Sequence, residues 1–156
     1  MGDTVVSVER VINAPAADIF AVVADASRHP EIDGSGSVRQ LKPGAPERLA
    51  LGTTFGMSMK LGVPYSMSNT VIEFEPDKRI AWQTTFAGPL GRFIGGRIWR
   101  YELEASGDGT LVRETWDITE DKQRFMLKGG PVGKQTKDAM AKTLARLAEI
   151  TERPAA

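Results

Sequence analysis

The residue whose type and position best suit catalysis is Glu114, which lies in a stretch where apolar and polar residues alternate. If Val112 and Trp116 face the interior of a strand, the period of two places Glu114 on the same face. Burial would raise the pKa of that carboxyl and suit it to general acid or base work. Arg97 shares the inward parity of Tyr101 on the neighbouring predicted strand, so an Arg97–Glu114 pair is one expectation. Two alternatives to a catalytic role of Glu114 remain: the pair is a structural ion pair, or a bulge turns Glu114 to solvent.

His29 is the only histidine of the chain. It could act as a proton shuttle, but its place at the end of a short predicted helix favours an exposed side chain. One histidine and no cysteine give no typical metal constellation, and no Ser-His-Asp set is readable. We therefore predict neither a metal nor a cofactor, and Glu114, Tyr101 and His29 are the catalytic candidates.

Aromatic and methionine side chains recur at period two along the predicted strands. On one concave face they could line an apolar pocket, because thioethers adapt to irregular ligands and Tyr and Trp add a polar tip. The simpler alternative for each residue is that it fills the core. The set comprises Met57, Met59, Tyr65, Met67, Trp82, Trp99, Tyr101 and Trp116.

The elements that position these residues follow from periodicity and from turn residues. Asn13 suits a helix N-cap, Pro15 suits the first helical turn, and a second short helix should end near Pro30. The connections are mostly short, which indicates an antiparallel sheet in an α+β architecture. We expect strands over 4–12, 38–42, 53–61, 65–75, 79–86, 97–105 and 110–119, short helices over 16–24 and 26–29, and a long helix over 132–152 with Met140, Leu144, Leu147 and Thr151 inward.

Composition restricts the partners. The chain has 156 residues, which suits one domain over 1–156, and 20 basic residues balance 20 acidic ones. This balance predicts neither nucleic-acid binding nor a polybasic membrane anchor on the scale of the whole chain. No signal peptide or membrane-spanning run is readable, so we expect a cytoplasmic protein without integral membrane association. A local basic cluster either meets an anionic partner or head-group or is a solvated helix face; it consists of Lys122, Arg124, Lys128, Lys134, Lys137 and Lys142.

Three segments carry a family resemblance: VERVINAPAADIF from Val8 to Phe20, VIEFEPDKRIAW from Val71 to Trp82, and GTLV from Gly109 to Val112. In this order the chain resembles the START-like (SRPBCC) superfamily and, within it, the polyketide cyclase/dehydrase and lipid-transport branch. The resemblance covers nearly the whole chain. It implies a helix-grip fold, in which a curved antiparallel sheet wraps around a long C-terminal helix and leaves an apolar cavity. The stretch 29–36 departs from the family's commoner pattern of aromatic residues around the proline.

The resemblance and the residues together predict binding or carriage of a hydrophobic small molecule, such as a lipid, polyketide or aromatic metabolite. Arg97, Tyr101 and Glu114 would orient its polar group, and Met140 and Leu144 would form the cavity floor. The alternative is a polyketide cyclase or dehydratase that uses Glu114 with Tyr101 or His29. A third hypothesis is an interaction protein with an incidental cavity. Either a monomer or a homodimer is compatible with the sequence.

Overall fold

The computed structural model describes residues 4–34, 38–41, 48–61, 63–86, 88–128 and 131–152, with the backbone only for 38–41, 57–61, 63–65 and 90. The predicted helices and strands occur in the predicted order, and two short helical segments, Pro89–Arg92 and Arg124–Lys128, come in addition. In chain order the elements are β1 (Val5–Ile12), α1 (Ala16–Val23), the 3-10 turn η1 (Ala26–Arg28), α2 (His29–Ile32), β2 (Val38–Leu41), β3 (Thr54–Leu61), β4 (Val63–Glu75), β5 (Arg79–Phe86), η2 (Pro89–Arg92), β6 (Gly95–Ser106), β7 (Gly109–Asp117), α3 (Arg124–Lys128) and α4 (Val132–Thr151).

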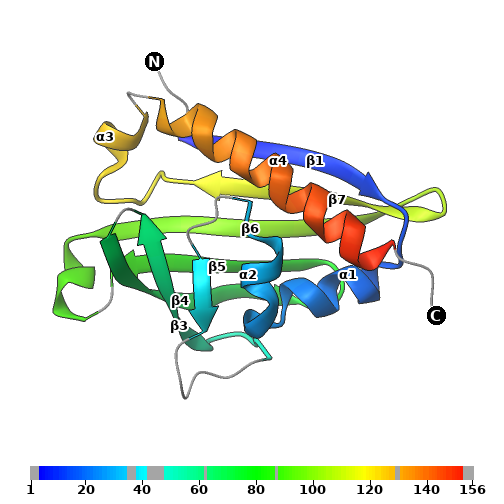
Figure 1. Ribbon diagram of the computed structural model, residues 1–156, viewed down its shortest axis with the longest axis horizontal. Coiled ribbons are helices and arrows are strands. Elements are labelled where there is room, and N and C mark those ends of the chain that lie inside the picture. The colour runs from blue at the N-terminus through cyan, green and yellow to red at the C-terminus, as the bar shows by residue number, and fades with distance from the viewer. Residues whose placement is uncertain are drawn as a thin grey trace.

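The strands form one antiparallel sheet in the order β1-β7-β6-β5-β4-β3-β2 (Figure 1). β1 therefore joins the far side of the sheet, beside the last strand, while the other neighbours are joined as hairpins. The tight β6–β7 turn closes with Ser106 opposite Gly109, and Gly107 there has a φ of 58°. Few non-glycine residues adopt such a φ, which explains the glycine at this turn. The predicted α+β helix-grip fold is confirmed.

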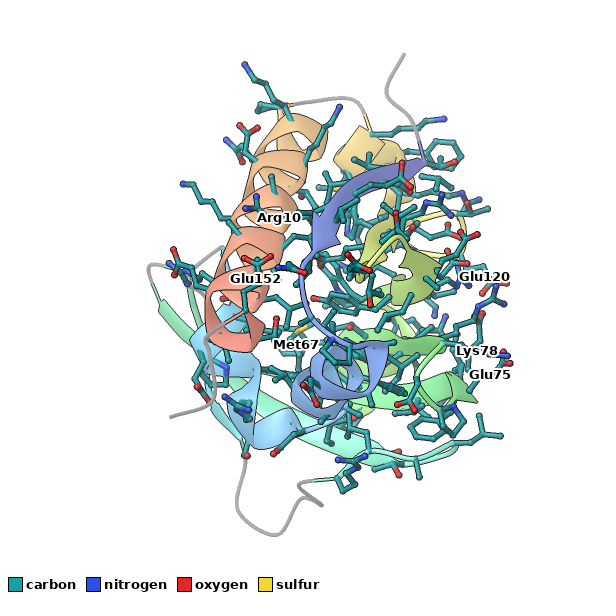
Figure 2. All side chains as sticks on the ribbon, turned by 90° about the vertical axis from the view of Figure 1, so that its right-hand side faces the viewer. Arg10, Met67, Glu75, Lys78, Glu120 and Glu152 are labelled. Carbon is teal, nitrogen blue, oxygen red and sulfur yellow. The ribbon has the colours of Figure 1, made fainter. Side chains whose placement is uncertain are left out.

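The long helix α4 lies across one face of the sheet, with β1 beside it (Figure 1). Met140, Leu144 and Leu147 are each at most 1% exposed and pack towards the sheet, as the helical spacing predicts. Thr151 is only half-buried; its hydroxyl donates to the carbonyl of Leu147 at 2.8 Å. Figure 2 shows Met67 in the interior, whereas Glu75 and Lys78 lie at the rim.

The two prolines near the N-terminus correct the predicted helix ends. Pro15, not Asn13, occupies the N-cap of α1, and the backbone N–H of Asn13 donates to Glu152 Oε2 at 2.7 Å. Pro30 lies in the first turn of α2 instead of ending a helix at His29. Both outcomes have one cause: the fixed φ of proline and its missing N–H fit the start of a helix as well as the break before one.

The outer face of the sheet carries ion pairs. Arg100 donates to both carboxyl oxygens of Glu73, at 2.9 and 2.6 Å, and Arg79 donates to Glu102 at 3.0 Å. The hydrogen bonds from Arg100 lower the pKa of the Glu73 carboxyl. The outer face of the sheet is therefore charged, and the face towards α4 is apolar.

The segment between β7 and α4 contains α3, a helix that the sequence analysis did not predict. Gly96 packs against this segment: it has a φ of 113°, and a Cβ there would lie 2.7 Å from the carbonyl oxygen of Glu120. Only glycine allows this close approach. Within the described ranges, no helix is long and apolar enough to cross a bilayer.

Candidate functional site

Glu114 lies on the inner face of β7, as the alternation with Val112 and Trp116 predicts. Glu114 is 4% exposed. In the sheet it stands opposite Tyr101 of β6 on one side and Val8 of β1 on the other. The carboxyl therefore enters an apolar layer between the sheet and α4.

The pKa of the Glu114 carboxyl is raised to about 8. Burial is the largest cause; the hydrogen bond with Tyr101 lowers the pKa, and the charge of Asp33 raises it. With this pKa about nine in ten of the molecules carry a neutral Glu114 at pH 7. Oε1 of Glu114 is buried without a hydrogen-bond partner among the described residues. A buried carboxyl oxygen usually has a partner, so this one is the most unusual polar atom of the inner face.

Tyr101 joins Glu114 to the aromatic residues of the sheet. Burial, followed by the charge of Glu114, raises the pKa of the Tyr101 hydroxyl well above its ordinary value, so the phenol stays neutral. Its ring centroid lies 5.7 Å from that of Trp82. The Tyr101–Glu114 pair is thus a polar spot enclosed by apolar side chains.

The expected Arg97–Glu114 pair is wrong. Arg97 stands opposite Thr84 in the sheet, two residues along β6 from the position facing Trp116. Its Nε donates to Oδ2 of Asp121 at 3.0 Å, and the Asp121 side chain is fully buried. Parity placed Arg97 on the correct face, but the partner comes from the loop after β7, which strand periodicity does not describe.

His29 is buried, not exposed as expected. It is 8% exposed, its ring stacks on Trp82 at 5.0 Å between centroids, and Phe55 contacts it edge-on at 5.7 Å. Because a carbonyl only accepts, Nε2 carries the proton and donates to the oxygen of Val23 at 2.8 Å. Desolvation lowers the pKa of His29, so its imidazole is neutral. Ring contacts thus run from His29 through Trp82 to Tyr101.

The predicted aromatic and methionine wall is buried wherever its side chains are described, except at Trp99, which is half-buried. Met67 and Trp82 are 7% and 8% exposed, and Trp116 and Met140 are 1% exposed. Leu144 belongs to the main core cluster, and half-buried Trp99 packs against both clusters. The side chains of Met57, Met59 and Tyr65 lie outside the described residues. The ligand-binding role of this wall therefore stays a prediction, as does the cavity behind it.

Asn69 and Thr84 are inner-face polar residues that the sequence analysis did not name. Thr84 Oγ1 donates to Asn69 Oδ1 at 2.6 Å, and Asn69 Nδ2 donates to the carbonyl of Phe55 at 3.4 Å. The signal was present, because Asn69 follows Met67 and Thr84 follows Trp82 by two residues. Each of the two side chains thus has a hydrogen-bond partner, whereas Oε1 of Glu114 has none among the described residues.

Two open surface depressions lie away from this inner face. One, of about 600 Å³, is lined by side chains such as Glu75, Lys78 and Glu102; the other, of about 430 Å³, lies between Arg28, Glu31 and Arg146. Both are bordered by charged groups, and Leu103, Ala105 and Leu111 also line the first. In the part of the chain that the structure describes, no three His, Asp or Glu residues come together as a metal site.

Comparison with known proteins places this arrangement in a family. The family model for polyketide cyclase/dehydrase and lipid transport matches residues 3–152. The chain belongs to this family. A Mycobacterium tuberculosis protein, Rv0088, is 41% identical over 109 residues, which are 68% of this chain and 44% of that protein. This member of the polyketide cyclase/dehydrase and lipid transport family therefore spans less than half the length of the curated relative.

Solved structures share the fold of this family member at low sequence identity. NE0264 from Nitrosomonas europaea has a TM-score of 0.70 at 14% identity, covering 96% of this chain and 94% of its own. Ms6760 from Mycobacterium smegmatis has a TM-score of 0.69 at 15% identity and covers 96% of both chains. DynU16, a protein of the dynemicin biosynthetic locus, has a TM-score of 0.67 at 18% identity, over 96% of this chain and 48% of its own.

Proposed function

We propose that this protein binds a hydrophobic small molecule between α4 and the sheet and orients a hydrogen-bonding group of that molecule at Glu114. The observation that carries the proposal is the buried Oε1 of Glu114 without a partner, next to the neutral hydroxyl of Tyr101. Leaving a buried polar atom unpaired costs roughly 1–3 kcal/mol. A guest with a ketone, hydroxyl or carboxyl group would recover part of that cost.

The protonation state indicates which group the guest presents. A neutral carboxyl carries one O–H donor as well as acceptor capacity. With its pKa near 8, Glu114 can therefore donate to a ketone oxygen at neutral pH. The apolar body of the guest would contact Trp82, Trp116 and Met140, whose side chains are at most 8% exposed in this structure.

The three tryptophans supply the readout. Trp82, Trp99 and Trp116 are the only tryptophans of the chain and all lie on the inner face. A guest that absorbs near their emission should quench their fluorescence saturably. Emodin, an anthraquinone with ketone groups, and pyrene, which has no hydrogen-bonding group, are suitable probes. We expect both probes to bind.

The decisive comparison replaces Glu114 by leucine. Glu114→Leu should weaken emodin binding by roughly fivefold to tenfold, the value of one hydrogen bond, and leave pyrene binding unchanged or tighter. Glu104→Gln, on the outer face of β6, is the matched control and should bind both probes like the wild type. Absence of saturable quenching by either probe would refute the proposal, and so would equal loss of both probes in Glu114→Leu with the fold intact.

A second candidate function is cyclisation and dehydration of a poly-β-ketone, which the family description includes. In an intramolecular aldol step, a methylene carbon between two ketones loses a proton and attacks another ketone carbon, whose oxygen takes up a proton; loss of water follows. A group with a pKa of about 8 suits proton transfer at neutral pH, and the raised pKa of Glu114 favours this candidate. Tyr101 is hydrogen-bonded to Glu114, while His29 lies further along the ring contacts.

The two candidates separate on one variant. With a synthetic poly-β-ketone thioester as the probe, a cyclase would release an aromatic product, and Glu114→Gln would abolish turnover while the probe still binds. A carrier would bind the thioester and release it unchanged. Retained turnover in Glu114→Gln would eliminate Glu114 as the acid or base.

A further inference from the structure

Three large apolar side chains project from the end of the sheet at which α4 begins. Phe125 and Met126 of α3 are 67% and 77% exposed, and Phe93 in the β5–β6 connection is 67% exposed. Figure 1 shows both segments at this end of the molecule. Gln123 links them: its Oε1 accepts from the N–H of Gly95 and its Nε2 donates to the carbonyl of Phe93, both at 2.8 Å. The two segments that carry the exposed side chains are thus hydrogen-bonded to each other.

Two cations lie over the ring of Phe125. The guanidinium of Arg124 lies 4.7 Å from the centroid of the Phe125 ring, and Nζ of Lys128 lies 4.9 Å from it. Lys122 is exposed beside them. None of the three cations forms a salt bridge with an acidic residue of the described ranges. We call this surface the α3 patch; it comprises Phe93, Lys122, Arg124, Phe125, Met126 and Lys128.

The charge balance of the whole chain hides this concentration. Residues 122–142 contain six Lys or Arg residues and a single acidic one, Asp138, although the chain as a whole is neutral. The prediction of no polybasic anchor was made for the whole chain, and it left open whether this segment meets an anionic partner. Lys134, Lys137 and Lys142 are exposed and extend the positive charge along α4.

The α3 helix packs on the core through one side chain. Leu127 packs against the core cluster of Trp116, Ile118 and Met140, while Phe125 and Met126 point to solvent. The core contact holds the apolar tips outward. It also connects the α3 patch with Trp116 and Met140, which belong to the predicted wall of the ligand site.

We propose that the α3 patch docks on the surface of a bilayer that contains anionic lipids. Exposed Phe and Met side chains enter the boundary between head-groups and acyl chains, and the surrounding Lys and Arg contact the phosphates. This combination distinguishes a bilayer from a nucleic acid, whose hydrated phosphates would leave Met126 without an apolar partner. The inference concerns a surface outside the proposed ligand site and does not depend on the role of Glu114.

Vesicle sedimentation of the full chain tests the proposal. The probes are vesicles of phosphatidylcholine alone and of three parts phosphatidylcholine to one part phosphatidylglycerol. The wild type should sediment with the anionic vesicles at about 0.1 M NaCl, much less at about 0.5 M, and not with the neutral ones. Phe125→Ser with Met126→Ser should reduce partitioning by about tenfold, and Lys122→Ala with Lys128→Ala by about 25-fold, or about fivefold per cation.

Two controls come from the opposite end of the strands. Leu51→Ser removes an apolar side chain of equal exposure, 66%, and Lys78→Ala removes an exposed cation; both should sediment like the wild type. The proposal is overturned if the wild type stays in solution with anionic vesicles or if the controls lose binding as much as the patch variants do. Concentration-dependent dimerisation that the patch variants abolish, or tighter binding to a short DNA duplex than to vesicles, would assign the patch to those partners instead.

Discussion

Replacing Glu114 by glutamine should remove a fall in stability with rising pH that the wild type shows. The pKa of Glu114 rises from an ordinary 4.5 to about 8 in the folded protein. Between these values the unfolded chain loses its proton while the folded one keeps it. The free energy of unfolding therefore decreases by about 1.4 kcal/mol per pH unit over this window. From pH 5 to pH 8 the loss amounts to about 3.5 kcal/mol, and glutamine, which does not ionise, escapes it.

Urea unfolding at half-unit steps from pH 5 to pH 8.5, followed by tryptophan fluorescence, measures this effect. The difference in free energy of unfolding between wild type and Glu114→Gln should shift by about 3.8 kcal/mol in favour of the variant across the range. Any constant effect of the amide cancels, because it is present at every pH. Glu149→Gln, at an exposed position of α4, is the control and should run parallel to the wild type. Parallel curves for Glu114→Gln itself would show that Glu114 is ionised in the folded protein, which would contradict its burial without a partner.

Other predictions concern single residues. In a proton NMR titration, the only histidine, His29, should show a midpoint below 6.5, because burial lowers its pKa. The free energy of unfolding should then fall as acid protonates the histidine of the unfolded chain below pH 6.5. A midpoint at or above 6.5 would contradict the burial of the ring. Gly96→Ala should lower the free energy of unfolding by roughly 2–4 kcal/mol, because Gly96 has a φ of 113° and the new Cβ would clash with a carbonyl oxygen. Gly133→Ala in α4 is the control: the new Cβ has open space there, and the substitution should be neutral or stabilise by up to about 1 kcal/mol. Arg100→Lys loses one of the two hydrogen bonds to Glu73. Because both side chains are partly exposed, the free energy of unfolding in urea should fall by less than about 1 kcal/mol, and a larger fall would contradict this weak contribution of the ion pair.

The sequence predicted the site best where strand periodicity applies. Alternation along 110–119 placed Glu114 inward between Val112 and Trp116, and the structure agrees. The same rule could have identified Asn69 and Thr84. It could not identify the partner of Arg97, because Asp121 comes from a loop whose position depends on how the chain returns to α4. His29 was misjudged for a related reason: a short helix has no periodicity from which burial can be read.

Local chemistry along the chain, which means alternating strands, turn glycines and one amphipathic helix, was sufficient to determine the antiparallel sheet, the order of its elements and the inward faces of β7 and α4. Only the tertiary structure decided that Glu114 meets Tyr101 and leaves Oε1 unpaired, that His29 stacks on Trp82, and that Gln123 joins the loop of Phe93 to the segment of Phe125. The physical reason is range. Periodicity and turn propensity act over a few residues, whereas these contacts join segments far apart in sequence, and their desolvation is set by the packed layers around them.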